Sequence, residues 1–286
     1  MSEIAHPAGA RRPRPASGHN DDRQRVDNEV VVKNEVVVET VDDARLASPD
    51  NTGETKSVEF QGAEIIAQAI SARGPLGCAF TNVSLDVGPG QLAVIAGSGG
   101  SGRTSLLLAL AGRMQLITGT VRVDEYLLPG DAQDVQRCVA VAQAPPAVDL
   151  DEHLRVGELI AERAMISGAN ATSEAVQELF EILGFDAPPD CRVGELRPPE
   201  RTLLAVSLAA AERPSAVIVD NADGGCGAEE ARRVWSALQS LAARGCTVLA
   251  SSTQIPDMLH GADIAATVLR HPLERDAIPA ESEVNA

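Results

Sequence analysis

The sequence has few aromatic residues, which make up 2% of its 286 residues. A core must therefore be built from Val, Leu, Ile and Ala, and the hydrophobic fraction of 44% is ample for one. No apolar run approaches the roughly 18 residues that cross a bilayer, and the first residues lack the apolar segment of a secretory signal. The apolar fraction excludes a wholly disordered chain, and the lack of a long apolar run argues against a membrane span.

Cysteine and lysine are also scarce. The five cysteines are an odd number and none forms a CxxC pair, which predicts free thiols in a reducing cytoplasm rather than disulfides or a zinc site. Both lysines, Lys33 and Lys56, lie near the start of the chain, and Arg alone is used after them. The net charge of −17 argues against general nucleic-acid binding, so no nucleic-acid partner is expected.

Composition divides the chain into three parts. Residues 1–56 are rich in Pro, Gly, Ser, Asn, Asp and Arg, and we expect a disordered tail there. This tail contains a repeat, NEVVVK at 28–33 and NEVVVE at 34–39, which either pairs with another strand or is a β-prone patch within the tail. The folded domain is expected at 57–270, followed by a C-terminal tail at 271–286.

The folded region alternates short apolar runs with segments of helical spacing. Strands are predicted at 63–70, 82–87, 91–96, 119–123, 138–142, 216–219, 247–250 and 264–269. Helices are predicted from Thr104 to near Gly112 and at 156–166, 172–183, 200–211 and 229–243. Apolar strands that alternate with helices predict an α/β fold with a parallel sheet covered on both faces.

The strongest candidate site is a glycine-rich segment between a predicted buried strand and a predicted helix. It consists of Gly97, Ser98, Gly99, Gly100, Ser101, Gly102, Arg103, Thr104 and Ser105. Glycines let successive N–H groups face one concavity, and the helix N-terminus adds positive potential, so the segment predicts a phosphate cradle rather than a structural turn. The Thr104 hydroxyl is placed to ligate Mg²⁺, whereas Arg103 stands where the pattern GxxxxGK[ST] has Lys.

A carboxylate provides a second signal. Asp220 ends the apolar run AVIV at 216–219, and in phosphate-loop proteins such an Asp helps to hold Mg²⁺. An ordinary surface Asp at the end of a strand is the alternative. Together with the glycine-rich segment, Asp220 indicates a site for phosphate groups and Mg²⁺.

From about Val58 to Leu269 the sequence resembles the nucleotide-binding subunit of the ATP-binding cassette (ABC) family. The segments that carry this resemblance are FTNVSLDV at 80–87 with Pro89-Gly90, LLALAG at 107–112, GTVRV at 119–123, VAQ at 141–143, the stretch 150–158 and the interval 196–220. The resemblance implies a P-loop NTPase fold with a mainly parallel core sheet, an antiparallel β portion and a small helical subdomain at about 147–198.

The resemblance also implies roles and partners. Gln143 falls at the position of the family's Gln loop, whose amide meets Mg²⁺ and senses the membrane partner, so Thr104, Gln143 and Asp220 are the expected metal-site residues. The implied partners are a membrane permease subunit and a second nucleotide-binding domain in a homodimer or heterodimer. The implied location is cytoplasmic, peripheral at the inner face of the cell membrane.

The sequence departs from the family pattern at catalytic positions. The signature LSGGQ reads Leu196-Arg197-Pro198-Pro199-Glu200, and its two prolines lack N–H donors, which suits the start of a helix better than an anion clamp. Asn221 replaces the general-base Glu, and the loss of a general base costs about 10²–10⁴ in rate. The switch His is replaced by Ser251 or Ser252.

These departures predict an ATP-binding transporter subunit with weak or absent hydrolysis, in which the nucleotide acts chiefly as a conformational ligand. The alternatives are a non-transport scaffold or regulatory protein that keeps the ABC fold, and a competent ATPase with substitute residues. Other candidates favour a structural role. Trp235 is expected in the core or an interface, and Glu195 and Glu200 are expected to be solvated.

Overall fold

The computed structural model describes residues 58–75, 77–167, 171–262 and 264–271. The predicted N-terminal tail with its Val-rich repeat, and residues 272–286 of the predicted C-terminal tail, lie outside the described residues. Within the described ranges, no helix combines the length and the apolar character that a membrane span needs.

Two β-sheets organise the described residues. Strands β6 (Val139–Gln143), β7 (Ala216–Val219), β8 (Thr247–Ser252), β3 (Leu92–Gly97) and β9 (Ala265–Leu269) form, in that order, a parallel five-stranded sheet. Strands β2 (Gly77–Val87), β1 (Ile65–Gly74), β4 (Leu116–Val123) and β5 (Tyr126–Leu128) form an antiparallel four-stranded sheet. The predicted fold class, a mainly parallel core with an antiparallel β portion, is therefore confirmed.

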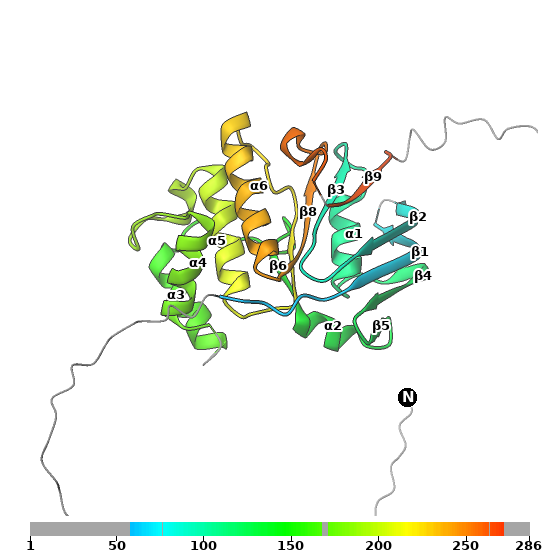
Figure 1. Ribbon diagram of the computed structural model, residues 1–286, viewed down its shortest axis with the longest axis horizontal. Coiled ribbons are helices and arrows are strands. Elements are labelled where there is room, and N and C mark those ends of the chain that lie inside the picture. Colours follow the sequence, from blue (N-terminus) through cyan, green and yellow to red (C-terminus); the bar gives the residue numbers. More distant parts are fainter. Residues whose placement is uncertain (1–57, 76, 168–170, 263, 272–286) are drawn as a thin grey trace, which may run out of the picture. The chain divides into compact units, whose positions relative to one another are not determined.

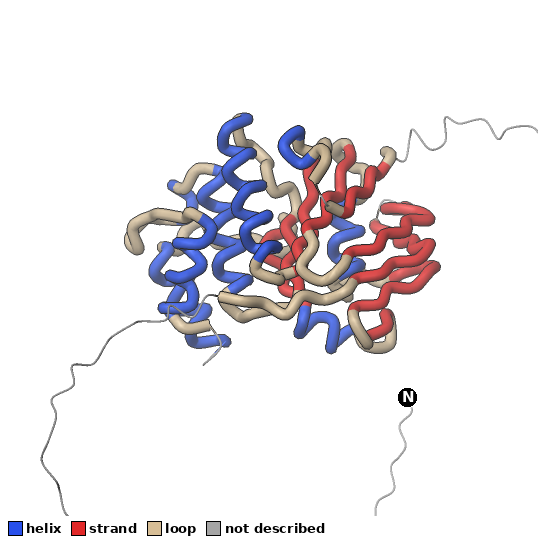
Figure 2. Tube along the Cα trace, in the orientation of Figure 1, coloured by secondary structure: helices blue, strands red, loops and turns tan. Residues whose placement is uncertain are grey.

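Helices cover the parallel sheet on both faces. The α-helices are α1 (Arg103–Leu110), α2 (Ala132–Cys138), α3 (Val156–Ser167), α4 (Ser173–Leu183), α5 (Pro198–Ala210) and α6 (Ala228–Ala243). Helices α5 and α6 contact one face, whereas α1 lies between the two sheets (Figure 1). Helix α4 packs on α5 and α6, and α3 packs on α4, so these four helices gather on one side and the antiparallel strands lie on the other (Figure 2).

The parallel strands supply two separate cores. In β3, Leu92 and Val94 face the core under α5 and α6, whereas Ala93 and Ile95 face the core around α1 and the antiparallel sheet. Successive side chains of a strand point to opposite faces, so a strand buried on both faces must be apolar throughout. This geometry explains the near-continuous apolar runs of the sequence. Trp235 lies fully buried in the first core, as predicted.

The boundaries of some elements differ from the predictions. Helix α5 begins at Pro198, two residues before the predicted start, because prolines are tolerated in the first turn, where their missing N–H has no helical acceptor. Strand β1 runs from Ile65 to Gly74, later at both ends than predicted. The short elements β5 and α2 were not predicted, since 3 and 7 residues are too few for a periodic pattern.

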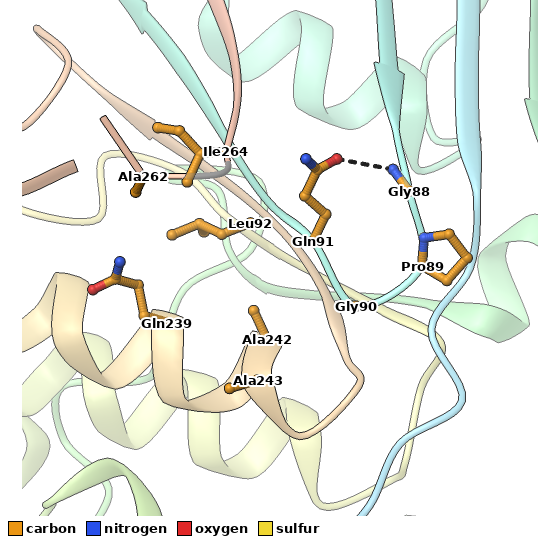
Figure 3. Close-up of a pocket in the computed structure, with 10 residues that line it drawn as sticks. All are labelled: Gly88, Pro89, Gly90, Gln91, Leu92, Gln239, Ala242, Ala243, Ala262 and Ile264. Carbon is orange, nitrogen blue, oxygen red and sulfur yellow. Dashed lines mark hydrogen bonds between the residues drawn. The ribbon is translucent and has the colours of Figure 1, made fainter. Parts of the chain in front are cut away.

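A groove of about 550 Å³ lies beside the N-terminal end of β3, away from the glycine-rich loop at the other end of this strand (Figure 3). Its lining includes Leu92, Ala242 of α6 and Gln91, whose Oε1 accepts a hydrogen bond from the Gly88 N–H at 3.0 Å. All of the lining side chains are uncharged. The groove therefore offers no cation for a phosphate group.

A buried threonine joins the segment before β1 to the parallel sheet. The Thr247 hydroxyl donates to the carbonyl oxygen of Ala63 at 2.7 Å and accepts from the N–H of Gly90 at 3.0 Å. Thr247 is fully buried, so both backbone groups depend on this hydroxyl rather than on bulk water.

We expect Thr247→Val to lower the free energy of unfolding by about 2–6 kcal/mol, because it leaves two buried backbone groups unsatisfied and each costs about 1–3 kcal/mol. Val keeps the size and the β-branch. Thr118→Val is the matched control, since its exposed hydroxyl makes one long bond of 3.4 Å to Ala69. Denaturant unfolding measures both variants, and equal losses would contradict the role assigned to Thr247.

Candidate functional site

The glycine-rich loop joins the end of β3 to the start of α1. Gly100 and Gly102 have φ values of 78° and 96°, which other residues rarely adopt. A Cβ at Gly102 would lie 2.2 Å from the carbonyl oxygen of Ala79, and one at Gly97 would lie 2.7 Å from that of Leu269. The glycines thus let the loop pack against β2 and β9 while its backbone curls.

The N-terminus of α1 is left open to an anion. Gly102 is the N-cap, no side chain caps the helix, and its first turn holds no acidic residue. The Leu106 N–H donates to the carbonyl of Gly102 at 2.9 Å, which is the first regular helical bond. The N–H groups of the helical residues before Leu106 have no acceptor within the helix. These N–H groups, together with the helix dipole, favour a phosphate at this end.

Two buried polar atoms in the loop also fit a phosphate ligand. Ser101 Oγ and Arg103 Nη1 are shielded from solvent and have no hydrogen-bond partner within the described ranges. Buried donors without partners are rare in native proteins. Phosphate oxygens are acceptors that both groups can use, and a guanidinium binds them in a planar fork.

A chain of hydrogen bonds connects the loop to the end of β7. The Thr104 hydroxyl donates to Asp220 Oδ2 at 2.6 Å, and the Ser251 hydroxyl donates to Asp220 Oδ1 at 2.5 Å. Ser251 Oγ also accepts from the N–H of Asn221 at 2.8 Å. Asp220 is 5% exposed, so these hydroxyls compensate much of the cost of burying its charge.

Gln143 reaches the same place from β6. Its Nε2 donates to the backbone carbonyl of Asp220 at 2.8 Å, so the structure brings the predicted metal-site residues Thr104, Gln143 and Asp220 together. In the part of the chain that the structure describes, no group of three or more His, Cys, Asp or Glu side chains could hold a metal ion. One carboxylate, a hydroxyl and an amide fit a Mg²⁺ ion that takes its remaining ligands from phosphate and water.

Asn221 lies at the rim of this arrangement. It is exposed and has a φ of 51°, a left-handed conformation in which Asn is enriched. Its side chain covers Gly224, where an added Cβ would lie 2.0 Å from Asn221 Nδ2. Asn221, which stands where the ABC family has its general-base Glu, therefore has a backbone conformation that suits Asn.

The two serines at the end of β8 have different partners. Ser251 holds Asp220, whereas Ser252 is 1% exposed and donates to both carboxylate oxygens of Asp223, at 2.8 and 2.9 Å. Asp223 also accepts from Trp235 Nε1 at 3.0 Å. The sequence did not predict this role for Asp223, because the Asp stands in a glycine-rich loop far from both donors in the chain.

The signature segment forms the N-terminus of α5. Pro198 and Pro199 occupy its first two positions, as expected. The prediction that Glu200 is solvated is wrong. Glu200 is 7% exposed and pairs with Arg197, and with Arg233 of α6 at 3.1 Å, because the packing of α6 on α5 brings Arg233 over it.

The surroundings of this segment are acidic. Burial raises the pKa of the Cys226 thiol to about 11, so the thiol is protonated at neutral pH. Three nearby carboxylates add to this increase, those of Glu230, Asp223 and Glu200. Two of these carboxylates are ion-paired, Glu200 with Arg197 and Arg233 and Glu230 with Arg197, so the charges beside this segment compensate one another in part.

A cavity of about 280 Å³ connects the two halves of the site. Gln143, Asp220 and Asn221 line one side, and Pro198 lines another. The structure thus places Gln143 and Asp220, two of the three predicted metal-site residues, around one space with Pro198 of the signature segment.

A phosphate loop between a buried parallel strand and a helix, facing a carboxylate at the end of a second strand, defines the class of P-loop nucleotide-binding proteins. Residues 80–224, just over half of the chain, match the sequence model of the family described as "ABC transporter". The chain belongs to this family.

Curated relatives match the chain at low identity. The Nod factor export ATP-binding protein I of Burkholderia pseudomallei (strain 1710b) is 27% identical over 167 residues, which cover 58% of this chain and 55% of the relative. The ribose import ATP-binding protein RbsA 2 of the same strain is 26% identical over 234 residues, which cover 75% of this chain and 44% of the relative. The chain thus spans about half the length of these relatives.

Solved structures show the same fold. MJ1267, an ATP-binding cassette of an ABC transporter in its ADP conformation, matches with a TM-score of 0.60 and 18% identity, covering 72% of this chain and 87% of that one. The dimeric cassette MJ0796 matches with a TM-score of 0.59 and 16% identity, covering 72% of this chain and 94% of that one.

We expect Gly102→Ala to destabilise the protein strongly, because the new methyl group would meet Ala79 in a left-handed conformation. Gly99→Ala is the matched control, since a Cβ there meets no atom within 4 Å. Thermal unfolding should show a clear drop for Gly102→Ala and little change for Gly99→Ala. Equal melting temperatures would mean that the loop does not pack as described.

Proposed function

We propose that the chain is the ATP-binding subunit of an ABC transporter, that it binds ATP with Mg²⁺ at residues 97–105, and that it couples to a membrane permease with weak or absent hydrolysis. The observation that carries the proposal is the neighbourhood of Asp220. The groups that hold nucleotide and metal converge on this carboxylate, and the next residue, Asn221, offers no base.

In this proposal the binding half of the site is complete. The N-terminus of α1 and the donors of Ser101 and Arg103 hold the phosphates, while Thr104, Gln143 and Asp220 surround the metal. Mg²⁺ bound there would neutralise phosphate charge. Arg103 keeps the charge of the Lys that the pattern expects, on a larger planar group.

The half of the site that drives hydrolysis lacks its usual groups. Asn221 cannot take a proton from an attacking water, and the Ser252 hydroxyl is buried against Asp223. At the N-terminus of α5 the prolines supply no N–H, and the carboxylate of Glu200 occupies the first turn. A γ-phosphate on a second subunit would therefore meet fewer backbone donors here.

A competent ATPase is the second candidate, favoured by Asp149. This residue lines the same cavity as Gln143 and Asp220 and pairs with Arg201 at 3.7 Å. A carboxylate on this wall is a substitute general base. If wild-type protein hydrolyses ATP and Asp149 is the general base, Asp149→Asn should reduce turnover by about 10²–10⁴-fold. A smaller reduction would contradict this second candidate.

The proposed partners follow from the family. One relative is named for export and another for import, and both are named as ATP-binding proteins. We therefore propose ATP binding for this chain and no particular transported substrate. MJ0796 is a dimeric cassette, and we propose a homodimer or heterodimer of nucleotide-binding domains for this chain. Docking on a permease would place the chain at the cytoplasmic face of the membrane.

We expect Thr104→Val to reduce the gain in ATP affinity that Mg²⁺ provides by about tenfold, or about 1.4 kcal/mol, because the variant lacks the hydroxyl oxygen proposed to ligate the metal. Val keeps the shape of Thr104 and removes the hydroxyl that donates to Asp220. Calorimetric titration of ATP with and without Mg²⁺ measures the gain.

Thr118→Val on β4 is the control for this titration and should bind as wild type. Wild-type protein that shows no Mg²⁺-dependent binding at millimolar ATP would overturn the proposed function. The non-transport scaffold or regulatory protein would then be the better explanation of the fold.

We expect Asn221→Glu alone to leave ATP turnover well below about one per second. The new carboxylate restores a base, but the donors that Pro198 and Pro199 lack stay missing, at about 10²–10³ in rate for each donor. A Glu with the φ of 51° found at Asn221 also costs about 1–2 kcal/mol.

Steady-state phosphate release should be measured for wild type, for Asn221→Glu and for a composite variant that restores the family's residues in all three segments. This variant carries Asn221→Glu, Arg103→Lys, Arg197→Ser, Pro198→Gly, Pro199→Gly and Glu200→Gln. Turnover of about one per second from Asn221→Glu alone would show that the signature segment is not needed.

A further inference from the structure

The loop between β7 and α6, residues 221–227, is anchored by one carboxylate. Asp223 accepts from the Ser252 hydroxyl at 2.8 and 2.9 Å and from Trp235 Nε1 at 3.0 Å. Ser252 is 1% exposed and Trp235 is 0% exposed, so water cannot replace Asp223 as their acceptor. Asp223 therefore ties the loop to β8 on one side and to α6 on the other.

Glycine makes up three of the other residues of this loop. Gly224, Gly225 and Gly227 place few limits on its backbone. Asn221 covers Gly224, and a Cβ at Gly225 would lie 3.3 Å from the ring of Pro198. The loop thus contacts the rim of the nucleotide site at one end and the start of α5 at the other.

Consecutive serines join this anchor to the nucleotide site. Ser251 donates to Asp220, which also accepts from Thr104, while Ser252 donates to Asp223. Ser251 and Ser252 are adjacent residues of β8, so a displacement of Ser251 by Asp220 would pass to Ser252 through their shared peptide unit. An unbroken set of contacts therefore runs from Thr104 to the indole of Trp235.

We propose that Asp223 is a positioning residue that transmits nucleotide binding from the Thr104–Asp220 pair to the loop 221–227 and to α6. The proposal rests on the proposed function, since it needs a nucleotide at residues 97–105. A cation held by Thr104, Gln143 and Asp220 would draw on this carboxylate, and Asp223 would carry the displacement to the part of the loop that contacts Pro198. Among the described residues, the Asp223 side chain makes the bonds to both Ser252 and Trp235.

The chain contains its own probe, because Trp235 is its only tryptophan. Its fluorescence and its single indole N–H resonance are therefore assigned without labelling. The indole N–H donates to Asp223 directly, so its chemical shift reports this hydrogen bond rather than the stability of the fold.

The experiment titrates the full chain with ATP and Mg²⁺ and follows Trp235 by fluorescence and by NMR, while calorimetry measures binding independently. Asp223→Ala removes the acceptor. Asp223→Asn is the conservative variant, since its Oδ1 accepts from the indole and its Nδ2 donates to Ser252. Ser240→Ala is the control on α6, because its hydroxyl bonds within the helix, to the carbonyl of Ser236.

In wild type and in Ser240→Ala, ATP with Mg²⁺ should shift the indole N–H resonance and change the emission. Asp223→Asn should keep more than half of the response. Asp223→Ala should lower the response about fivefold or more, while calorimetry still detects ATP binding. A full response in Asp223→Ala would overturn the proposal.

Two further outcomes separate this proposal from the function on which it rests. If ATP binds to wild type and the indole signals stay unchanged, the role of Asp223 is wrong and the proposed function stands. If calorimetry detects no ATP binding to wild type, both fail. An indole signal that stays unchanged when ATP binds to wild type overturns the proposal even if Asp223→Ala does not fold.

Discussion

The buried carboxylate of Asp220 is the interaction on which the site depends. A charge that is 95% shielded is costly unless hydrogen bonds replace water, and here Thr104 and Ser251 each donate to one of its oxygens. The Asp220 carbonyl accepts from Gln143 as well. Asp220, directly after β7, thereby connects the start of α1 to the C-terminal ends of β6, β7 and β8.

The sequence predicts this part of the site because its signals are local. A run of glycines between an apolar strand and a helix predicts a phosphate cradle of backbone N–H groups, and Asp220 directly follows an apolar run. The family resemblance adds Gln143. The fold class follows equally from local patterns, since strands buried on both faces are apolar throughout and helices show one apolar face.

Other features depend on residues that are distant in the chain. The burial of Glu200 requires Arg233, which α6 brings to it, and no pattern near Glu200 reveals this partner. Asp223 likewise meets Ser252 and Trp235 only after β8 and α6 are in place. Side-chain pairing across elements is decided by packing, so the sequence predicted neither interaction.

The two cores that share the parallel sheet have a consequence for how the chain can diverge. Their residues lie along the strands and helix faces, whereas Arg103, Asn221 and Pro198 lie where elements begin or end. Substitutions at such ends remove no apolar contact from either core. The architecture can therefore outlast changes in chemistry, and two chains can share this fold while one turns over its nucleotide and the other merely holds it.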